Sequence, residues 1–186
     1  MIKIVLASKS PRRSELLRQM GVEFEILPSD LLEVITKEKP EEIVMELSAQ
    51  KAREVAGKCK DALVIGADTI VVNDGRIMGK PKDEEDACCM LEKLSGHTHC
   101  VLTGVTLIHK EEEVTFYERT EVEVSKLSKE EILNYVATRD CMDKAGSYGI
   151  QGEFAKFITG IKGDYNNVVG FPIAKTYQEL KKMGIL

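Results

Sequence analysis

The sequence contains no apolar run that approaches the roughly 20 residues needed to cross a lipid bilayer, so we expect no membrane-spanning segment and no membrane partner. We also expect no secretory signal, because the mostly apolar residues 2–7 are few and lead directly into charged sequence. There is no internal repeat and no low-complexity segment. The composition of the chain is that of an ordinary globular protein.

Cysteine is scarce and irregularly placed. The five residues are odd in number, include an adjacent pair and show no CxxC spacing, which argues against a disulfide framework and against a zinc site. We therefore expect reduced thiols and a cytoplasmic location. Histidine shows no metal-ligand pattern either, and no role is assigned to His97, His99 or His109.

An excess of positive charge is also missing. The chain has 26 Lys and Arg against 31 Asp and Glu, a net charge of −5, which argues against general binding to nucleic acid. Any site for phosphate groups must therefore be a local concentration of basic residues. With 186 residues, 43% of them hydrophobic, the chain is expected to form one domain, residues 1–186, with a substantial core.

Such a basic concentration lies at residues 6–17, LASKSPRRSELL. Ser10 is suited to cap a helix, and the proline after it to occupy the first helical position. Arg12 and Arg13 then fall in the first turn, at the positive end of the helix dipole, where acidic residues are preferred. A bound anion would relieve this arrangement, since backbone N–H groups, the hydroxyls of Ser8 and Ser10 and two guanidinium groups can hold phosphate oxygens. The alternative is a helix start with solvated arginines.

Strands and helices alternate in the first half of the chain and hairpins dominate the middle, which predicts an α/β fold with a mixed, twisted sheet and flanking helices. Strands are expected at residues 2–6, 22–27, 62–72, 76–79, 100–108, 114–124 and 154–161. The strand at 62–72 is expected to be central and to be interrupted at residues 66–69. Helices are expected to begin at Pro11, Pro40, Glu84, after Ser128 and at Pro172.

Asp68 lies inside the most apolar stretch of the chain, ALVIGADTIVV at residues 62–72. A carboxylate there is costly to desolvate unless it is paired, bound to a metal or held at the edge of a cleft. It could accept a proton from water or hold a divalent cation, for which Mg²⁺ is natural beside phosphates. The alternative is a structural aspartate that accepts backbone hydrogen bonds.

Two lysines and a glutamine are candidates for the same chemistry. Lys51 stands on the apolar stripe of a helix, where a lysine either snorkels to the edge of the core or reaches into a cleft. Lys80 follows the returning strand of a hairpin turned at residues 73–75, and a tight turn would place it near Asp68; an exposed strand-end lysine is the alternative. Gln151 carries an amide that can read the edge of a base, which alone is weak evidence.

Seven motifs follow one another along the chain: LASKSPRRSELL (6–17), AQKA (49–52), IGADTIV (65–71), GKP (79–81), LSGHTH (94–99), DKAGSYGIQG (143–152) and GDYNNVVGFP (163–172). Together they closely resemble the Maf family of nucleotide pyrophosphatases. The resemblance implies an elongated α/β fold with a deep central cleft, akin to the inosine triphosphatase superfamily. It also implies hydrolysis of nucleoside triphosphates to monophosphate and pyrophosphate with a divalent cation, Mg²⁺ or Mn²⁺. The expectation of a homodimer rests on the resemblance alone.

The resemblance also implies roles for individual residues. Asp68 matches the proposed catalytic proton acceptor, and Glu33 matches an acidic cleft residue, so these two are the candidate ligands of the cation. The conserved polar residues expected to bind the phosphates are Ser8, Arg12, Arg13, Lys51 and Lys80. The positions associated with substrate choice are Arg12, Thr69 and Gln151. Their combination resembles the subfamily that acts on dTTP and UTP.

Three functions remain open on the sequence alone. The leading hypothesis is hydrolysis of dTTP and UTP between the α- and β-phosphates. One alternative is the same reaction on modified or non-standard nucleotides. The other is a nucleotide-binding regulator of cell division and septum formation with little turnover, a role that the resemblance also implies.

Overall fold

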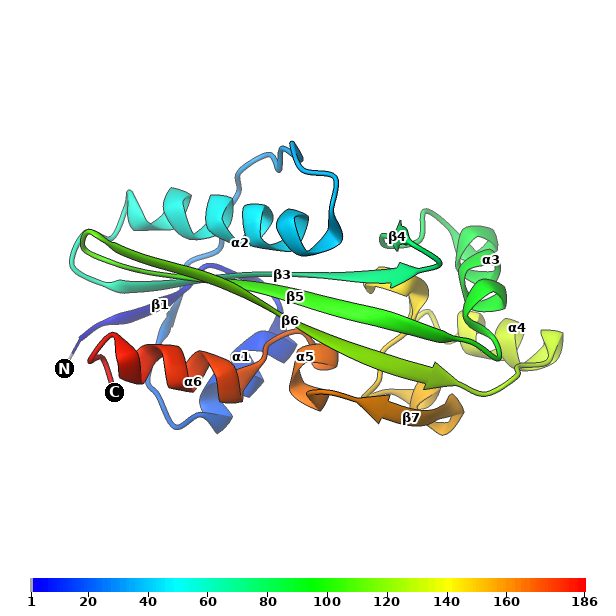
Figure 1. Cartoon of the computed structure of the whole chain (residues 1–186). Coiled ribbons are helices and arrows are strands. Elements are labelled where there is room, and N and C mark those ends of the chain that lie inside the picture. Colours follow the sequence, from blue (N-terminus) through cyan, green and yellow to red (C-terminus); the bar gives the residue numbers. More distant parts are fainter. Residues whose placement is uncertain (1) are drawn as a thin grey trace. The chain divides into compact units, whose positions relative to one another are not determined.

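The computed structural model describes residues 2–186 and has the mixed α/β fold that the sequence predicts (Figure 1). Its strands are hydrogen-bonded in the order β2 (Glu25–Ile26), β1 (Ile4–Leu6), β3 (Leu63–Asn73), β5 (Thr98–His109), β6 (Glu112–Val124) and β7 (Ile158–Lys162), and β4 (Arg76–Met78) pairs with β3. The chain divides into two compact units, and the single domain expected for the whole chain stays a prediction. Unit 1 comprises Met1–Thr69, Thr103–Glu118 and Gly170–Leu186, and unit 2 comprises Ile70–Leu102 and Arg119–Val169.

Unit 1 is built on short parallel strands. β1 (Ile4–Leu6) pairs in parallel with β2 (Glu25–Ile26) and with the beginning of β3 (Leu63–Asn73), where Leu6 lies opposite Ile65. The strand expected at residues 22–27 is wrong in length, because β2 covers only two of these residues. Its expected half-burial is confirmed at Val22 and Phe24, which are partly buried, but not at Ile26, which is 48% exposed. β2 is the edge strand of the sheet, so both of its residues remain exposed.

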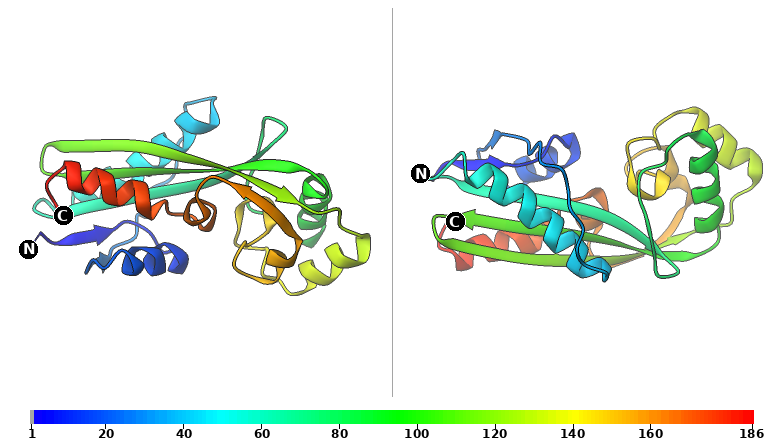
Figure 2. Two further views of the ribbon diagram at one scale, coloured as in Figure 1. Left: turned by 60° about the horizontal axis from the view of Figure 1, so that its bottom comes forward. Right: turned by 90° about the horizontal axis from the view of Figure 1, so that it is seen from above.

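Helices cover both faces of these strands. α2 (Pro40–Ala56) lies on one face, and α1 (Pro11–Gln19) and α6 (Ile173–Lys182) lie on the other, as Figure 2 shows from two further directions. Ser10 caps α1 as predicted, because its side chain accepts a hydrogen bond from the backbone N–H of Arg13. Beneath α2 the core consists of small apolar side chains, namely Val5, Ala7, Ala52, Val55, Ala62 and Val64.

Two glycines allow α2 to approach the strands closely. A Cβ atom at Gly66 would lie 2.3 Å from the carbonyl oxygen of Ser48, and one at Gly104 would lie 2.2 Å from that of Val44. The predicted interruption of the central strand is therefore wrong. β3 runs without a break from Leu63 to Asn73, because the glycine serves a helix contact and not a bend in the strand.

Unit 2 contains most of the hairpins. A two-residue turn joins β3 to β4, with Asp74 and Gly75 at φ angles of 48° and 72°, which confirms the predicted hairpin. The strand expected at 154–161 is partly wrong, because its first half is a 3-10 helix. The elements are β4 (Arg76–Met78), α3 (Glu84–Leu94), α4 (Lys129–Ala137), η1 (Ala145–Ser147), η2 (Glu153–Phe157), β7 (Ile158–Lys162) and α5 (Tyr165–Val169). β5 (Thr98–His109) and β6 (Glu112–Val124) extend through both units.

A buried histidine in unit 2 has a role that the sequence pattern did not indicate. The side chain of His99 is 1% exposed, and its Nε2 lies 2.7 Å from the hydroxyl of Tyr148. The Tyr148 ring in turn packs against Phe154, with centroids 4.8 Å apart. Burial lowers the pKa of His99 from 6.5 to about 4, because the charged imidazolium loses its hydration. His99 is therefore a neutral core residue at physiological pH.

This lowered pKa predicts that unit 2 loses stability as the solution becomes acidic. Between about pH 4 and pH 6.5 the unfolded chain binds the histidine proton and the folded chain does not, so stability falls as the pH falls through this window. We expect the free energy of unfolding to drop by about 2 kcal/mol from His99 alone between pH 7 and pH 5. Urea unfolding of the wild type and of His99→Gln at both pH values measures this. An equal pH dependence in the two proteins would contradict the prediction.

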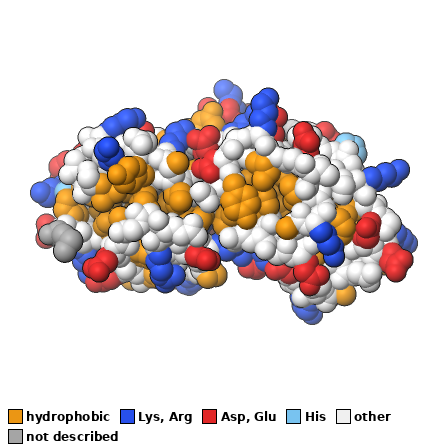
Figure 3. Space-filling view, turned by 90° about the horizontal axis from the view of Figure 1, so that it is seen from below, with side chains coloured by type: hydrophobic (Ala, Val, Ile, Leu, Met, Phe, Trp, Pro, Cys, Tyr) orange, Lys and Arg blue, Asp and Glu red, His pale blue; other side chains and the backbone are white. Residues whose placement is uncertain are grey.

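Charge of one sign does not gather on the face drawn in Figure 3. Lys and Arg side chains there are interspersed with Asp and Glu, and apolar side chains form separate clusters between them. No helix among residues 2–186 is long and apolar enough to cross a membrane.

Candidate active site

The candidate site in unit 1 lies at the carboxyl end of β1, where ligands commonly bind in open α/β sheets. The backbone N–H of Ala7 donates to the carbonyl of Ile65 at 2.8 Å, after which the chain leaves β3 and turns into α1. Ser8 lies where the chain leaves β3 and is buried, with 8% of its surface exposed. Its hydroxyl accepts a hydrogen bond from the backbone N–H of Ser10 at 3.2 Å. The loop before α1 is therefore held by its own serines.

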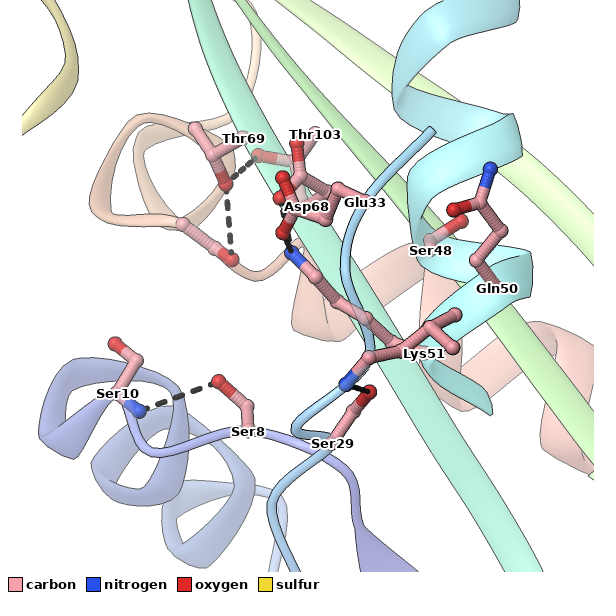
Figure 4. A network of polar contacts seen from close by, with 12 residues as sticks. Ser8, Ser10, Ser29, Glu33, Ser48, Gln50, Lys51, Asp68, Thr69 and Thr103 are labelled. Atoms are coloured by element: carbon pink, nitrogen blue, oxygen red, sulfur yellow. Dashed lines mark hydrogen bonds and ion pairs between the residues drawn. The ribbon is translucent and has the colours of Figure 1, made fainter. Parts of the chain in front are cut away.

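Lys51 joins two carboxylates at the centre of the site. Its Nζ lies 2.5 Å from Oδ1 of Asp68 and 2.8 Å from Oε1 of Glu33 (Figure 4). The side chains of Lys51 and Asp68 are 17% and 14% exposed, whereas Glu33 is 46% exposed. The structure thus answers the question that the sequence left open, since Lys51 does not snorkel away from the core. It reaches along the strand surface to the one carboxylate embedded in the apolar run.

Glu33 belongs to a loop, residues 28–39, that is anchored to the same helix as Lys51. The side-chain amide of Gln50 accepts from the backbone N–H of Val34 at 3.0 Å and donates to its carbonyl at 2.6 Å. Glu46 accepts from the backbone N–H of Thr36 at 2.9 Å and also from its hydroxyl. Two side chains of α2 therefore hold the residues that directly follow Glu33.

Arg13 is tied into the protein more tightly than its position in the sequence suggests. Its Nε donates to the carbonyl of Gly170 at 2.9 Å, Nη1 to the hydroxyl of Ser8 at 3.2 Å, and Nη2 to the hydroxyl of Thr69 at 3.0 Å. Burial lowers the pKa of Arg13, the charge of Asp68 raises it, and the neighbouring Arg12 lowers it further. Three of the five guanidinium N–H groups are used by the protein, so Arg13 is an anchored cation and not an open fork.

Thr69 links three segments that are distant in the sequence. Besides Arg13, its hydroxyl meets that of Thr103 on β5 at 3.0 Å and donates to the carbonyl of Gly170 at 3.5 Å. Successive strand residues point to opposite faces, and this alternation sends Asp68 to a lysine of α2 and Thr69 to an arginine of α1. Adjacent residues of β3 thereby connect the helices on the two faces.

The remaining sequence-predicted residues are distributed between the units. Arg12 follows Pro11 in the first turn of α1. Lys80 and Gln151 are exposed residues of unit 2, and their segments are joined there, because the N–H of Gly146 donates to the carbonyl of Gly79 at 3.0 Å. The expected proximity of Lys80 to Asp68 stays a prediction.

The site offers two carboxylates to a cation. Among residues 2–186 the structure holds no group of three or more His, Cys, Asp and Glu side chains suited to a metal. However, Asp68 and Glu33 each place an oxygen within 2.8 Å of the same positively charged atom, Nζ of Lys51. This donor set fits Mg²⁺ or Mn²⁺, which bind through one or two carboxylates and complete their shells with water and substrate phosphates.

Sequence reasoning missed the residues that position the charged groups. The carbonyl of Gly170 receives the Arg13 side chain, and Gln50 holds the loop that carries Glu33. Gly170 has a φ angle of 124°, which favours glycine, and it lies in the motif GDYNNVVGFP, so a signal was present for this residue. Gln50 lies in the motif AQKA, but a glutamine on a helix has no pattern of its own that would indicate its contact with the loop.

A comparison with protein families identifies the chain. The model of the Maf family, described as Maf-like protein, matches residues 3–183, and the chain is a member of that family.

Individual members are close in sequence. A protein of Agathobacter rectalis named dTTP/UTP pyrophosphatase is 54% identical, with 100% of this chain and 99% of the relative covered. A protein of Bacillus cereus with the same name is also 54% identical, with 100% and 97% covered. A solved dITP/XTP pyrophosphatase of Mycobacterium abscessus aligns over 99% of this chain and 97% of its own at 16% identity and a TM-score of 0.49, too distant to bear on activity.

Proposed function

We propose that the protein hydrolyses dTTP and UTP between the α- and β-phosphates and releases the nucleoside monophosphate and pyrophosphate. Full-length relatives at 54% identity that are named dTTP/UTP pyrophosphatase support this assignment. The structural observation that carries it is the Asp68 carboxylate, 14% exposed and 2.5 Å from the Lys51 ammonium, beside an anchored arginine. A carboxylate that can accept a proton, next to cations that can stabilise phosphate charge, suits water attack on a phosphate anhydride.

The residues of unit 1 divide the chemistry between them. Asp68 accepts the proton of the attacking water. Lys51 and Arg13 attract the phosphate oxygens and stabilise the charge that develops on the departing pyrophosphate. Ser8 and Arg12 add hydrogen-bond donors at the start of α1, where the helix dipole also favours an anion.

Three assignments rest on the family resemblance. Lys80 contributes to phosphate binding, and Gln151 selects the base together with Arg12 and Thr69. Asp68 and Glu33 hold the divalent cation, which when bound neutralises phosphate charge and polarises the reacting phosphoryl group. A homodimer and a cytoplasmic location stay predictions.

A substrate panel tests this function. The purified chain is incubated with dTTP, UTP, CTP, ATP, GTP and modified pyrimidine triphosphates in Mg²⁺ or Mn²⁺, and pyrophosphate release is followed with a coupled inorganic pyrophosphatase. We expect turnover that is fastest with dTTP and UTP. Faster turnover of a modified pyrimidine nucleotide would mean that the same reaction acts mainly on modified nucleotides. Tight nucleotide binding without turnover would overturn the proposal in favour of the cell-division regulator.

A further inference from the structure

The charged side chains at the site are paired with one another. Two carboxylates, Asp68 and Glu33, share the Lys51 ammonium at 2.5 and 2.8 Å. The guanidinium of Arg13 is close enough for both carboxylates to raise its pKa. Two negative and two positive groups therefore neutralise one another, and Arg12 adds a further positive charge beside Arg13.

We propose that Lys51 is an internal counter-ion that occupies the place of the divalent cation in the free protein. On this inference the ammonium leaves Asp68 and Glu33 for the phosphates only when a polyphosphate enters. The metal and the triphosphate therefore bind as one complex, and the metal alone binds weakly. The inference rests on the proposed function for the identity of the anion, but its effect on metal affinity is measured without a nucleotide.

Electrostatics favours this order of binding. A divalent cation entering alone would meet an ammonium already bonded to both of its carboxylate ligands, and like charges at such distances repel strongly in a partly buried site. A triphosphate entering alone would draw the Lys51 ammonium away and leave two carboxylates without their counter-ion. The complex of the two avoids both penalties, because the phosphates attract the Lys51 ammonium while the cation takes its place.

The carboxylates are positioned to remain in place when the lysine moves. Gln50 binds both the N–H and the carbonyl of Val34, and Glu46 binds Thr36, so the loop that carries Glu33 is fixed to α2 independently of Lys51. Asp68 is fixed by β3, which is continuous at this point. The long, flexible lysine side chain is the mobile member of the triad.

Mn²⁺ binding to the nucleotide-free protein tests the inference directly. The electron paramagnetic resonance signal of free aqueous Mn²⁺ is titrated with wild type and with Lys51→Met, which keeps the length of the side chain without its charge. We expect Lys51→Met to bind Mn²⁺ about tenfold more tightly or better, because the competing ammonium is gone. The added substitution Glu33→Gln should abolish this gain.

Lys9→Met is the matched control. It removes one positive charge from the same unit and frees the carboxylate of Asp30, whose exposed ion pair with Lys9 measures 2.8 Å. It should leave Mn²⁺ affinity at the wild-type value. Equal affinity of wild type and Lys51→Met would overturn the inference, whatever the substrate panel shows.

The wild type provides a second test that needs no variant. Calorimetric titrations with Mn²⁺ alone, with a non-hydrolysable dTTP analogue alone and with the premixed complex should show tight binding only for the complex. Tight binding of Mn²⁺ alone to the wild type would also overturn the inference. Failure of the proposed function, by contrast, would appear as absent turnover in the substrate panel.

Discussion

Asp68→Asn is expected to lower pyrophosphate release from dTTP and UTP by about 10³-fold, the range lost when a general base is removed. Asparagine keeps the shape of the side chain but cannot take a proton from water, and it leaves Lys51 with only the half-exposed Glu33 as an ionic partner. The measurement is kcat in saturating substrate with Mg²⁺ or Mn²⁺, together with a circular dichroism spectrum that establishes folding.

Asp61→Asn is the control for this substitution. Asp61 is exposed and lies just before β3, seven positions before Asp68 in the chain. Its substitution makes the same chemical change at a different position. We expect its rate to stay near that of the wild type. If the folded Asp68→Asn protein also turned over at a near-wild-type rate, Asp68 would not be the proton acceptor.

Gly66→Ala is expected to destabilise unit 1 by about 3 kcal/mol or more, because overpacking against backbone cannot be relieved by a side-chain rotation. The added Cβ would lie 2.3 Å from the carbonyl oxygen of Ser48 and 2.8 Å from the backbone nitrogen of Ala52. The helix would have to move away from β3, and Lys51, which precedes Ala52, would move with it. Urea unfolding measures the loss of stability, and the rate with dTTP should fall in parallel.

Gly57→Ala separates this steric effect from the general effect of adding a methyl group. Gly57 caps α2 with a φ angle of −58°, and a Cβ there would meet only ordinary contacts, the nearest at 3.5 Å. Its free energy of unfolding should stay within about 0.5 kcal/mol of the wild-type value. Equal unfolding midpoints for Gly66→Ala and Gly57→Ala would contradict the close approach of α2 to β3.

Local signals in the sequence identified the elements that position the site. Ser10 and Pro11 predict the start of α1, and the capping box of Ser128 and Glu131 predicts that of α4; both are confirmed. The charge of Asp68 within an apolar run marked the residue at the centre of the site. These signals succeed because they act over a few residues, where chain neighbours determine the conformation.

Features that depend on tertiary packing could not be predicted in this way. Gly66 looked like a break in a strand, and only the helix packed against it explains a glycine there. Arg13 looked like an open phosphate fork, but Gly170, 157 positions away, holds one of its nitrogens. His99 lacked any motif partner, because Tyr148 reaches it from a segment 49 positions distant.

The most direct test of the central claim, water attack at the α-phosphorus with pyrophosphate as the leaving group, is hydrolysis of dTTP in water enriched in ¹⁸O. Mass spectrometry of the products locates the label. We predict that one ¹⁸O atom enters the phosphate of dTMP and that the pyrophosphate remains unlabelled. Label in the pyrophosphate would place the attack on the β-phosphorus, and release of dTDP with labelled inorganic phosphate would show that a different bond is cut.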